Sequence, residues 1–175
     1  MKKQLIVGIG VLLIGALQSW AGVSIEDDSF MKKGLFQGKM LGDDWSHKKG
    51  GGAFSVRNAE ITFYHKKSNG WISVNSFSID EDYREKPVEA NVENFLWINR
   101  EIELSRKSIT VDGHNVIWLE AEDEKKYYKA VNVYVRLSDE YACWITYGNT
   151  PSFFSEFLSV FEGFLQDFKI LTDKQ

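Results

Sequence analysis

Short connections between strand-like runs constrain the fold of this sequence more than any other feature. Residues 127–137 and 141–147 are rich in β-branched and aromatic side chains, and only a short turn-favouring segment separates them. The apolar runs 61–64 and 71–77 are separated by a segment that ends in Asn69-Gly70, a strong hairpin signal. Connections this short join antiparallel strands. The sequence therefore predicts a mostly antiparallel sheet.

Two helices are expected to cover this sheet. Apolar side chains recur at helical spacing over residues 88–102, and charged residues between them form a face that meets water. A second, Phe-rich stripe follows Thr150, the expected N-cap, and Pro151, the expected first helical residue. A further strand is expected over 115–120, and residues 168–171 are expected to return as a short edge strand. The predicted order is β-β-α-β-β-β-α, an α+β fold in which helices cover a mostly antiparallel sheet.

This order and its apolar pattern resemble the PsbP-like superfamily, which includes the extrinsic P-protein of photosystem II and the Mog-type Ran-binding proteins. The resemblance covers residues 53–171. It is based on the first hairpin, the long helix, and the three strands over Val116–Ala121, 127–137 and 141–147. It also includes the final Phe-rich helix, which runs into Phe168-Lys169. The Pro-Gly-Trp-type turn that often opens such domains is absent. The resemblance implies a non-catalytic α/β/α sandwich that docks onto a larger partner, and it supplies no functional residues.

The first 21 residues have the three zones of a secretory signal peptide. Lys2 and Lys3 form the charged start, residues 5–17 form an apolar middle of 13 residues, and Ser19-Trp20-Ala21 places small residues where signal peptidase cleaves. A membrane-spanning helix needs about 20 apolar residues, so cleavage before Gly22 is expected rather than retention as an anchor. The chain is therefore expected to be exported from a bacterial cell, to the periplasm or the medium, with no stable membrane span.

The rest of the chain is expected to contain one domain. Residues 22–52 are polar, end in Lys-Lys-Gly-Gly-Gly, and repeat apolar residues at a spacing that fits neither a helix nor a strand. They are interpreted as a loosely held lead-in to a single α+β domain over residues 53–175. Because Cys143 is the only cysteine, this domain cannot form an internal disulfide and must be stable through packing.

Composition and motifs exclude several functions. Without residues 1–21 the chain keeps 19 of its 21 basic residues and all 25 acidic ones, a formal charge of −6. This disfavours nucleic acids and anionic membranes as partners, because phosphate contacts need a basic surface. His47, His65 and His114 lack the spacing of metal ligands, so neither a metal nor another cofactor is expected. No serine-hydrolase motif is present.

Two catalytic arrangements remain open on the sequence alone. Cys143, His114 and Asp112 would form a nucleophilic site only if the fold placed them together. A glycosidase pair of carboxylates could come from anywhere in the chain. No catalytic residue is therefore assigned.

Aromatic side chains along the predicted strands supply the candidate partner-binding residues. In the strand over 127–137, the valines occupy one face and leave tyrosines and an arginine on the other. If open, that face would suit protein recognition, because Tyr, Trp and Arg dominate binding hot spots. If a helix covered it, as is usual in a sandwich, these residues would belong to the core. The candidates are Trp118, Tyr128, Tyr134, Arg136 and Trp144.

These observations predict an exported, non-enzymatic binding or accessory protein of the bacterial envelope. It would dock onto another envelope or secreted protein, as an inhibitor or an immunity-type protein does. The alternative is a small envelope hydrolase or a glycan-binding module whose site is assembled from scattered residues. A deep pocket with converging carboxylates, or contact between Cys143 and His114, would favour the hydrolase.

Overall fold

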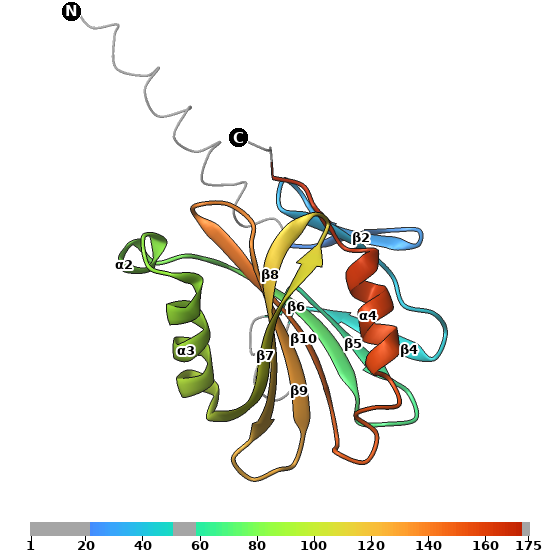
Figure 1. The fold of residues 1–175 in the computed structure, drawn as a ribbon. Helices are drawn as coiled ribbons and strands as arrows, with labels where there is room; N and C mark the ends of the chain where they lie inside the picture. The colour runs from blue at the N-terminus through green and yellow to red at the C-terminus, as the bar shows by residue number, and fades with distance from the viewer. Residues whose placement is uncertain (1–21, 51–58, 173–175) are drawn as a thin grey trace, which may run out of the picture.

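Two antiparallel sheets form the scaffold of the computed structural model, which describes residues 22–50 and 59–172 (Figure 1). The expected signal peptide and its cleavage site lie outside these residues. The large sheet has the order β4-β5-β6-β10-β9-β8-β7. Its strands are β4 (Trp45–Lys49), β5 (Ile61–His65), β6 (Trp71–Ser78), β7 (Glu101–Val111), β8 (His114–Asp123), β9 (Lys129–Arg136) and β10 (Tyr141–Asn149).

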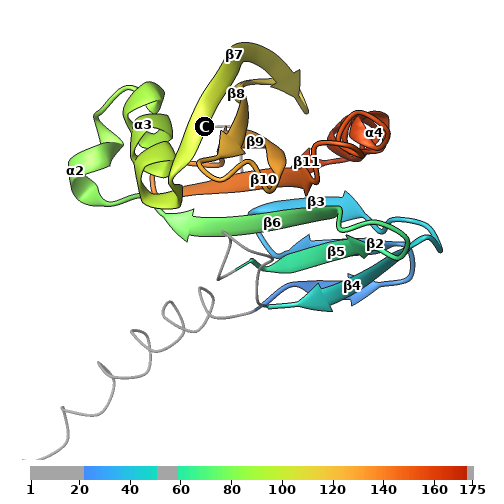
Figure 2. The ribbon, with the colours of Figure 1, turned by 90° about the horizontal axis from the view of Figure 1, so that it is seen from below.

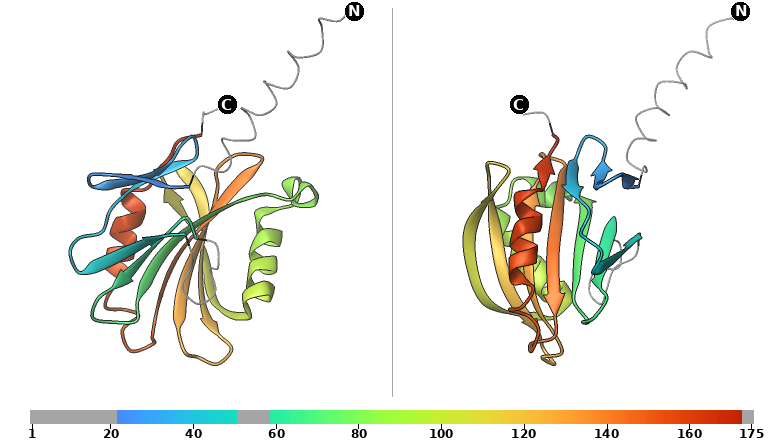
Figure 3. Two further views of the ribbon diagram at one scale, coloured as in Figure 1. Left: turned by 180° about the vertical axis from the view of Figure 1, so that it is seen from behind. Right: turned by 90° about the vertical axis from the view of Figure 1, so that its right-hand side faces the viewer.

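The small sheet has the order β1-β2-β3-β11 and joins the two ends of the described chain. Its strands are β1 (Ser24–Glu26), β2 (Ser29–Lys32), β3 (Phe36–Lys39) and β11 (Lys169–Ile170). The expected edge strand at the C-terminal end is confirmed, since Lys169 and Ile170 pair with Gln37 and Phe36. Figure 3 shows the N-terminal strands beside β11.

Helices lie on both faces of the large sheet. The chain forms α2 (Glu81–Arg84) and α3 (Val88–Asn99) between β6 and β7, and α4 (Leu158–Gln166) after β10. Figure 2 shows α3 and α4 on opposite sides of the sheet. Two separate apolar clusters match this arrangement, one beneath each helix. The predicted α+β class is therefore confirmed, with a second sheet added.

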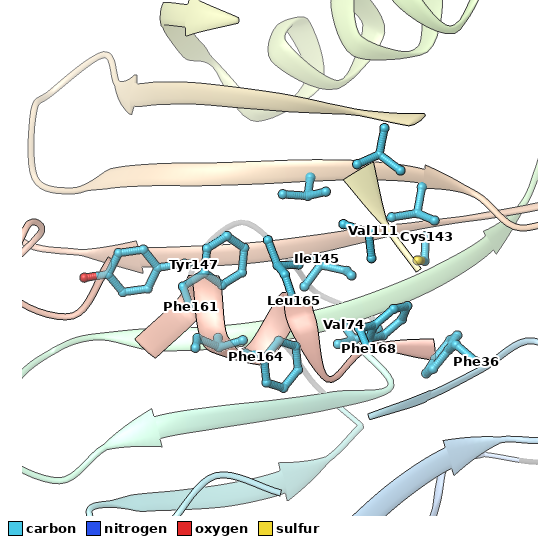
Figure 4. Packing of buried hydrophobic residues seen from close by; sticks show 14 of the residues in the cluster. Phe36, Val74, Val111, Cys143, Ile145, Tyr147, Phe161, Phe164, Leu165 and Phe168 are labelled. Atoms are coloured by element: carbon cyan, nitrogen blue, oxygen red, sulfur yellow. The ribbon is translucent and has the colours of Figure 1, made fainter. Parts of the chain in front are cut away.

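The larger cluster lies between the large sheet, α4 and the small sheet. Alternate residues of β9 and β10 point toward α4, as the period of two along a strand requires. Figure 4 shows Ile145 and Tyr147 facing Phe161 and Leu165 of α4. The rings of Tyr147 and Phe161 stack with their centroids 5.7 Å apart. Burial of this aromatic surface contributes to the stability of the fold.

Residues 22–50 differ from the expected loosely held lead-in, because they form four strands. Phe30 and Phe36 are completely buried, and Phe30 stacks on Phe164 of α4 with centroids 5.9 Å apart. Gly38 makes room for the Phe30 ring, since a Cβ there would lie 2.4 Å from Phe30 Cζ. These strands have three to five residues each. Strands so short cannot display a clear alternation.

The helix expected over residues 88–102 is shorter than predicted. It ends at Asn99, where Arg100 takes the left-handed conformation with φ 54°. The chain then runs straight into β7, an 11-residue strand that the sequence reading left out. A tight turn with positive φ at Asp112 and Gly113 leads on into β8. The predicted order β-β-α-β-β-β-α therefore lacks one strand after the helix.

The final helix also begins later than expected. Residues 151–156 form turns, and α4 starts at Leu158 with Phe157 at the N-cap position. Thr150 and Pro151 therefore do not cap it. Their pattern instead marks the turn after β10, where the amide N–H of Phe153 donates to the carbonyl of Thr150 at 3.0 Å.

Candidate functional site

A groove of about 930 Å³ opens where α3 covers only part of its face of the large sheet. Strands β6 and β10 form its floor, α3 forms one wall, and the connection between β8 and β9 closes one end. We call this cavity the α3 groove. Its lining includes Asn75, Phe77, Asn91, Asn94, Phe95 and Trp144.

The spacing of α3 decides which of its side chains meet the sheet. Val92 and Leu96, one turn apart, are buried against it. Asn91 and Asn94 lie on the neighbouring stripe and line the groove. Thus α3 presents its apolar side to the core and an amide-bearing side to the cavity.

The candidate aromatic residues do not form an open surface. Tyr134 and Trp144 are 1 % and 6 % exposed, and their rings pack together beneath α3 with centroids 5.0 Å apart. Phe95 of α3 lies on Trp144 with a centroid distance of 4.1 Å. Helix α3 therefore covers this face, which places Tyr134 and Trp144 in the second core. Only the edge of Trp144 reaches the groove.

The other three candidates lie in different environments. Trp118 is on the opposite face of the sheet, buried against Phe161 of α4 with centroids 5.8 Å apart. Arg136 is half-buried, and its guanidinium donates to the Arg84 carbonyl at 3.0 Å. Tyr128 lines the groove. The structure thus brings Tyr128 and Trp144 to one site and separates Trp118 and Arg136 from it.

A buried carboxyl, Glu101, lies next to the groove and was missed by the sequence reading. It is the first residue of β7 and is 7 % exposed. The Tyr128 hydroxyl donates to its Oε1 at 3.2 Å, and the Asn132 side-chain amide donates to its Oε2 at 2.9 Å. The Thr146 hydroxyl in turn donates to the Asn132 carbonyl oxygen at 2.9 Å. These four polar side chains form one buried network.

Burial raises the pKa of Glu101 from 4.5 to about 7. Hydrogen bonds from Tyr128 and Asn132 lower this pKa in part, and the nearby Asp123 carboxylate raises it further. Glu101 therefore changes its charge near neutral pH. The signal for such a group was present in the sequence, since Asn132 and Thr146 are polar residues at inward positions of otherwise apolar strands.

A single buried carboxyl does not make a hydrolytic pair. Asp123, the cross-strand neighbour of Glu101, uses its carboxylate to hold the β8–β9 connection. Its Oδ1 accepts from the Tyr128 amide at 3.0 Å and its Oδ2 from the Lys125 amide at 3.3 Å. A glycosidase needs two carboxyls that both face the substrate, and Asp123 is occupied by these backbone contacts.

Exposed apolar side chains gather at the junction of α3 with β7. Trp97 is 80 % exposed and Tyr127, in the β8–β9 connection, is 71 % exposed. Ile98 lies between the α3 groove and a second hollow of about 740 Å³ that Trp97 also lines. Ile102 and Leu104, near the start of β7, are also exposed, at 47 % and 42 %. We call these five residues the α3–β7 patch.

The other candidate chemistries find no support in the described residues. Cys143 is completely buried in the larger apolar cluster, and burial raises the pKa of its thiol. Asp112 lies in the β7–β8 turn and accepts hydrogen bonds from the amide of Ile170 and the ammonium of Lys169. Within residues 22–50 and 59–172, no group of three or more His, Cys, Asp and Glu side chains is placed to hold a metal ion.

The described residues form no helix that could cross a membrane. None of the helices formed by the described residues is both long enough and apolar enough to traverse a bilayer.

Comparisons with known proteins identify the fold. The sequence matches no family model and no curated protein. The structure is similar to cyanobacterial PsbP from Synechocystis sp. PCC 6803, with a TM-score of 0.58 and 12 % identity over 86 % of this chain and 93 % of that one. A Bacteroides thetaiotaomicron protein aligns with a TM-score of 0.52 and 12 % identity, over 86 % of this chain and 50 % of that one. The fold is therefore PsbP-like.

Proposed function

We propose that this chain is an exported, non-enzymatic accessory protein that docks onto another protein through the α3–β7 patch. The observation that carries the proposal is the exposure of Trp97. Five of the seven large apolar side chains that are exposed among the described residues belong to this one region. Large apolar side chains that are exposed in one region of a folded domain indicate an interaction site.

Trp97, the most exposed residue of the patch, is not part of the buried core of this domain. Trp97 lies on the outer side of α3, while Val92 and Leu96 make the contacts with the sheet. Tryptophan is among the residues that dominate binding hot spots, because it buries roughly 150–250 Å² of surface at low entropic cost. A partner that covered Trp97 would recover this area from water.

The contents of the site favour binding over catalysis. Glu101 is enclosed by its hydrogen-bond donors, Asp123 is held by backbone amides, and Cys143 is buried in the other core. The PsbP-like fold agrees with this choice, because the sequence resemblance implied a non-catalytic sandwich that docks onto a larger partner. The expected signal peptide would place the partner in the envelope or the medium.

Quantitative affinity capture tests the proposal. The purified chain, Trp97→Ala and Phe153→Ala would each be immobilised and exposed to envelope extract of the source cells. Phe153 is a matched control, since it is 43 % exposed but lies in the turn before α4. The wild type and Phe153→Ala should retain the same protein, and Trp97→Ala should lose it by a factor of about 30 or more, as expected for a hot spot of at least 2 kcal/mol. Equal retention by Trp97→Ala would overturn the proposal.

A further inference from the structure

We propose that the α3 groove is a binding site for a neutral, hydroxyl-rich ligand, a short oligosaccharide. The groove shares Ile98 and Tyr127 with the α3–β7 patch, but the residues that carry this inference lie outside the patch, so it does not depend on protein docking. Its volume of about 930 Å³ lies near the upper end of the range of about 300–1,000 Å³ that is typical of small-ligand sites. The space suits several linked sugar rings better than a single one.

Free amide groups line the cavity. Asn91 and Asn94 of α3 and Asn75 of β6 are half-buried, and their side chains make no hydrogen bond within the part of the chain that the structure describes. A side-chain amide offers two donor hydrogens and one acceptor oxygen. A sugar hydroxyl also both donates and accepts, so amides facing a cavity match it in either role.

Aromatic surface lies beside these amides. Phe77 of β6 and Phe95 of α3 are half-buried at the groove, with Tyr83 and Tyr128 at its margins. The C–H faces of a pyranose ring are apolar and pack against aromatic rings, while its rim of hydroxyls remains free for hydrogen bonds. A cavity lined by both side-chain amides and aromatic rings therefore fits the hydroxyl groups of a carbohydrate as well as its apolar C–H faces.

The charges of the groove argue against an anionic ligand. Asp80, Asp123 and Glu124 are opposed only by Arg100 and Lys125 among the residues that line it. A phosphate or carboxylate ligand requires an excess of donors with positive charge. The cavity thus disfavours an anionic molecule.

The floor argues against an extended peptide. Strands β6 and β10 are interior strands of the large sheet, and their backbone groups pair with each other from residue 71 to residue 78. A peptide that binds by strand addition needs a free sheet edge. The floor of the groove therefore offers no free strand edge.

Calorimetric titration of the purified chain tests this assignment. The probes would be maltotriose, cellotriose and triacetylchitotriose as neutral sugars, with trialanine and inorganic phosphate as the alternatives. We expect at least one trisaccharide to bind saturably with a Kd of about 1 mM or tighter. The double variant Asn91→Ala/Asn94→Ala should weaken it at least tenfold, and Asn115→Ala, an exposed asparagine outside the groove, should not.

The variants separate this proposal from protein docking. Alanine is the best helix former, so the double variant should keep its circular dichroism spectrum and its thermal midpoint. Neither Asn91 nor Asn94 belongs to the α3–β7 patch, so partner capture should persist. Absence of binding for all three sugars, equal sugar binding by the double variant, or binding of trialanine or phosphate alone would each overturn the assignment.

Discussion

Replacing Glu101 by glutamine should stabilise the protein at alkaline pH and leave it unchanged in acid. The Glu101 carboxyl keeps its proton to a higher pH in the folded protein than in the unfolded chain, because burial raises its pKa from 4.5 to about 7. The folded state therefore tolerates the neutral form better than the charged one. The contribution of Glu101 to the free energy of unfolding is fully present below about pH 4.5, and it is lost as the pH rises through about 7.

The size of the effect follows from the shift. Each pKa unit corresponds to about 1.36 kcal/mol of differential stability, so ionised Glu101 costs the fold about 3 kcal/mol above pH 8. Glutamine avoids this cost and keeps the network. Its oxygen can accept from the Asn132 amide, and its nitrogen can donate to the Tyr128 oxygen. For a protein of this size the midpoint of thermal unfolding should rise by roughly 6–12 °C at pH 8.

Urea unfolding of wild type and Glu101→Gln at pH 4.5, 6, 7 and 8 measures this directly. The difference between the two proteins isolates Glu101, because all other groups titrate in both. Glu103→Gln is the matched control, since Glu103 lies two residues along β7, is exposed and pairs with Arg106. Its replacement should change stability by no more than about 1 kcal/mol at any of the four pH values. If Glu101→Gln were no more stable than wild type at pH 8, the buried, neutral state of Glu101 would be refuted.

Three further outcomes follow from packing. Phe36→Ala should lower the free energy of unfolding by about 3–5 kcal/mol, because Phe36 is completely buried. The exposed control Phe153→Ala should stay near wild type. An equal, small effect of both substitutions in urea titrations would show that residues 22–50 are not part of the core. Gly148→Ala should destabilise by about 1–3 kcal/mol, because its Cβ would lie 2.1 Å from Trp71 Cζ2; an unchanged thermal midpoint would contradict that close approach. The Cys143 thiol should react with a disulfide reagent only after unfolding, so rapid colour development in native buffer would contradict its burial.

The strands that the sequence predicted correctly are those with a strong local signal. The hairpin of β5 and β6 has an Asn-Gly turn, and β9 and β10 alternate cleanly between two buried faces. The strand β7 escaped detection because it is an edge strand whose side chains are mostly exposed, with four charged residues among its eleven. Charges between apolar residues occur on an amphipathic helix as well as on such a strand, so the preceding helix was extended through Ile102.

The candidate site was only partly predictable for a different reason. The alternation in β9 correctly put Tyr128 and Tyr134 on one face, but it could not show that α3 lies over Tyr134. The burial of Glu101 depends on Asn132, 31 residues later in the chain. Contacts between residues so distant in sequence follow from strand order, and no local pattern reports them. The exposure of Trp97 was hidden for the same reason, since it depends on which side of α3 meets the sheet.

Site-specific photocrosslinking in the source cells tests the docking proposal most directly. A photoreactive phenylalanine analogue would replace Trp97 in one variant and Phe153 in a second. With the analogue at position 97, irradiation should yield a single covalent adduct with one other protein, because the α3–β7 patch is covered in the complex. At position 153 the same adduct should be absent. Loss of the adduct at position 97, or an equal adduct at position 153, would contradict docking through the patch.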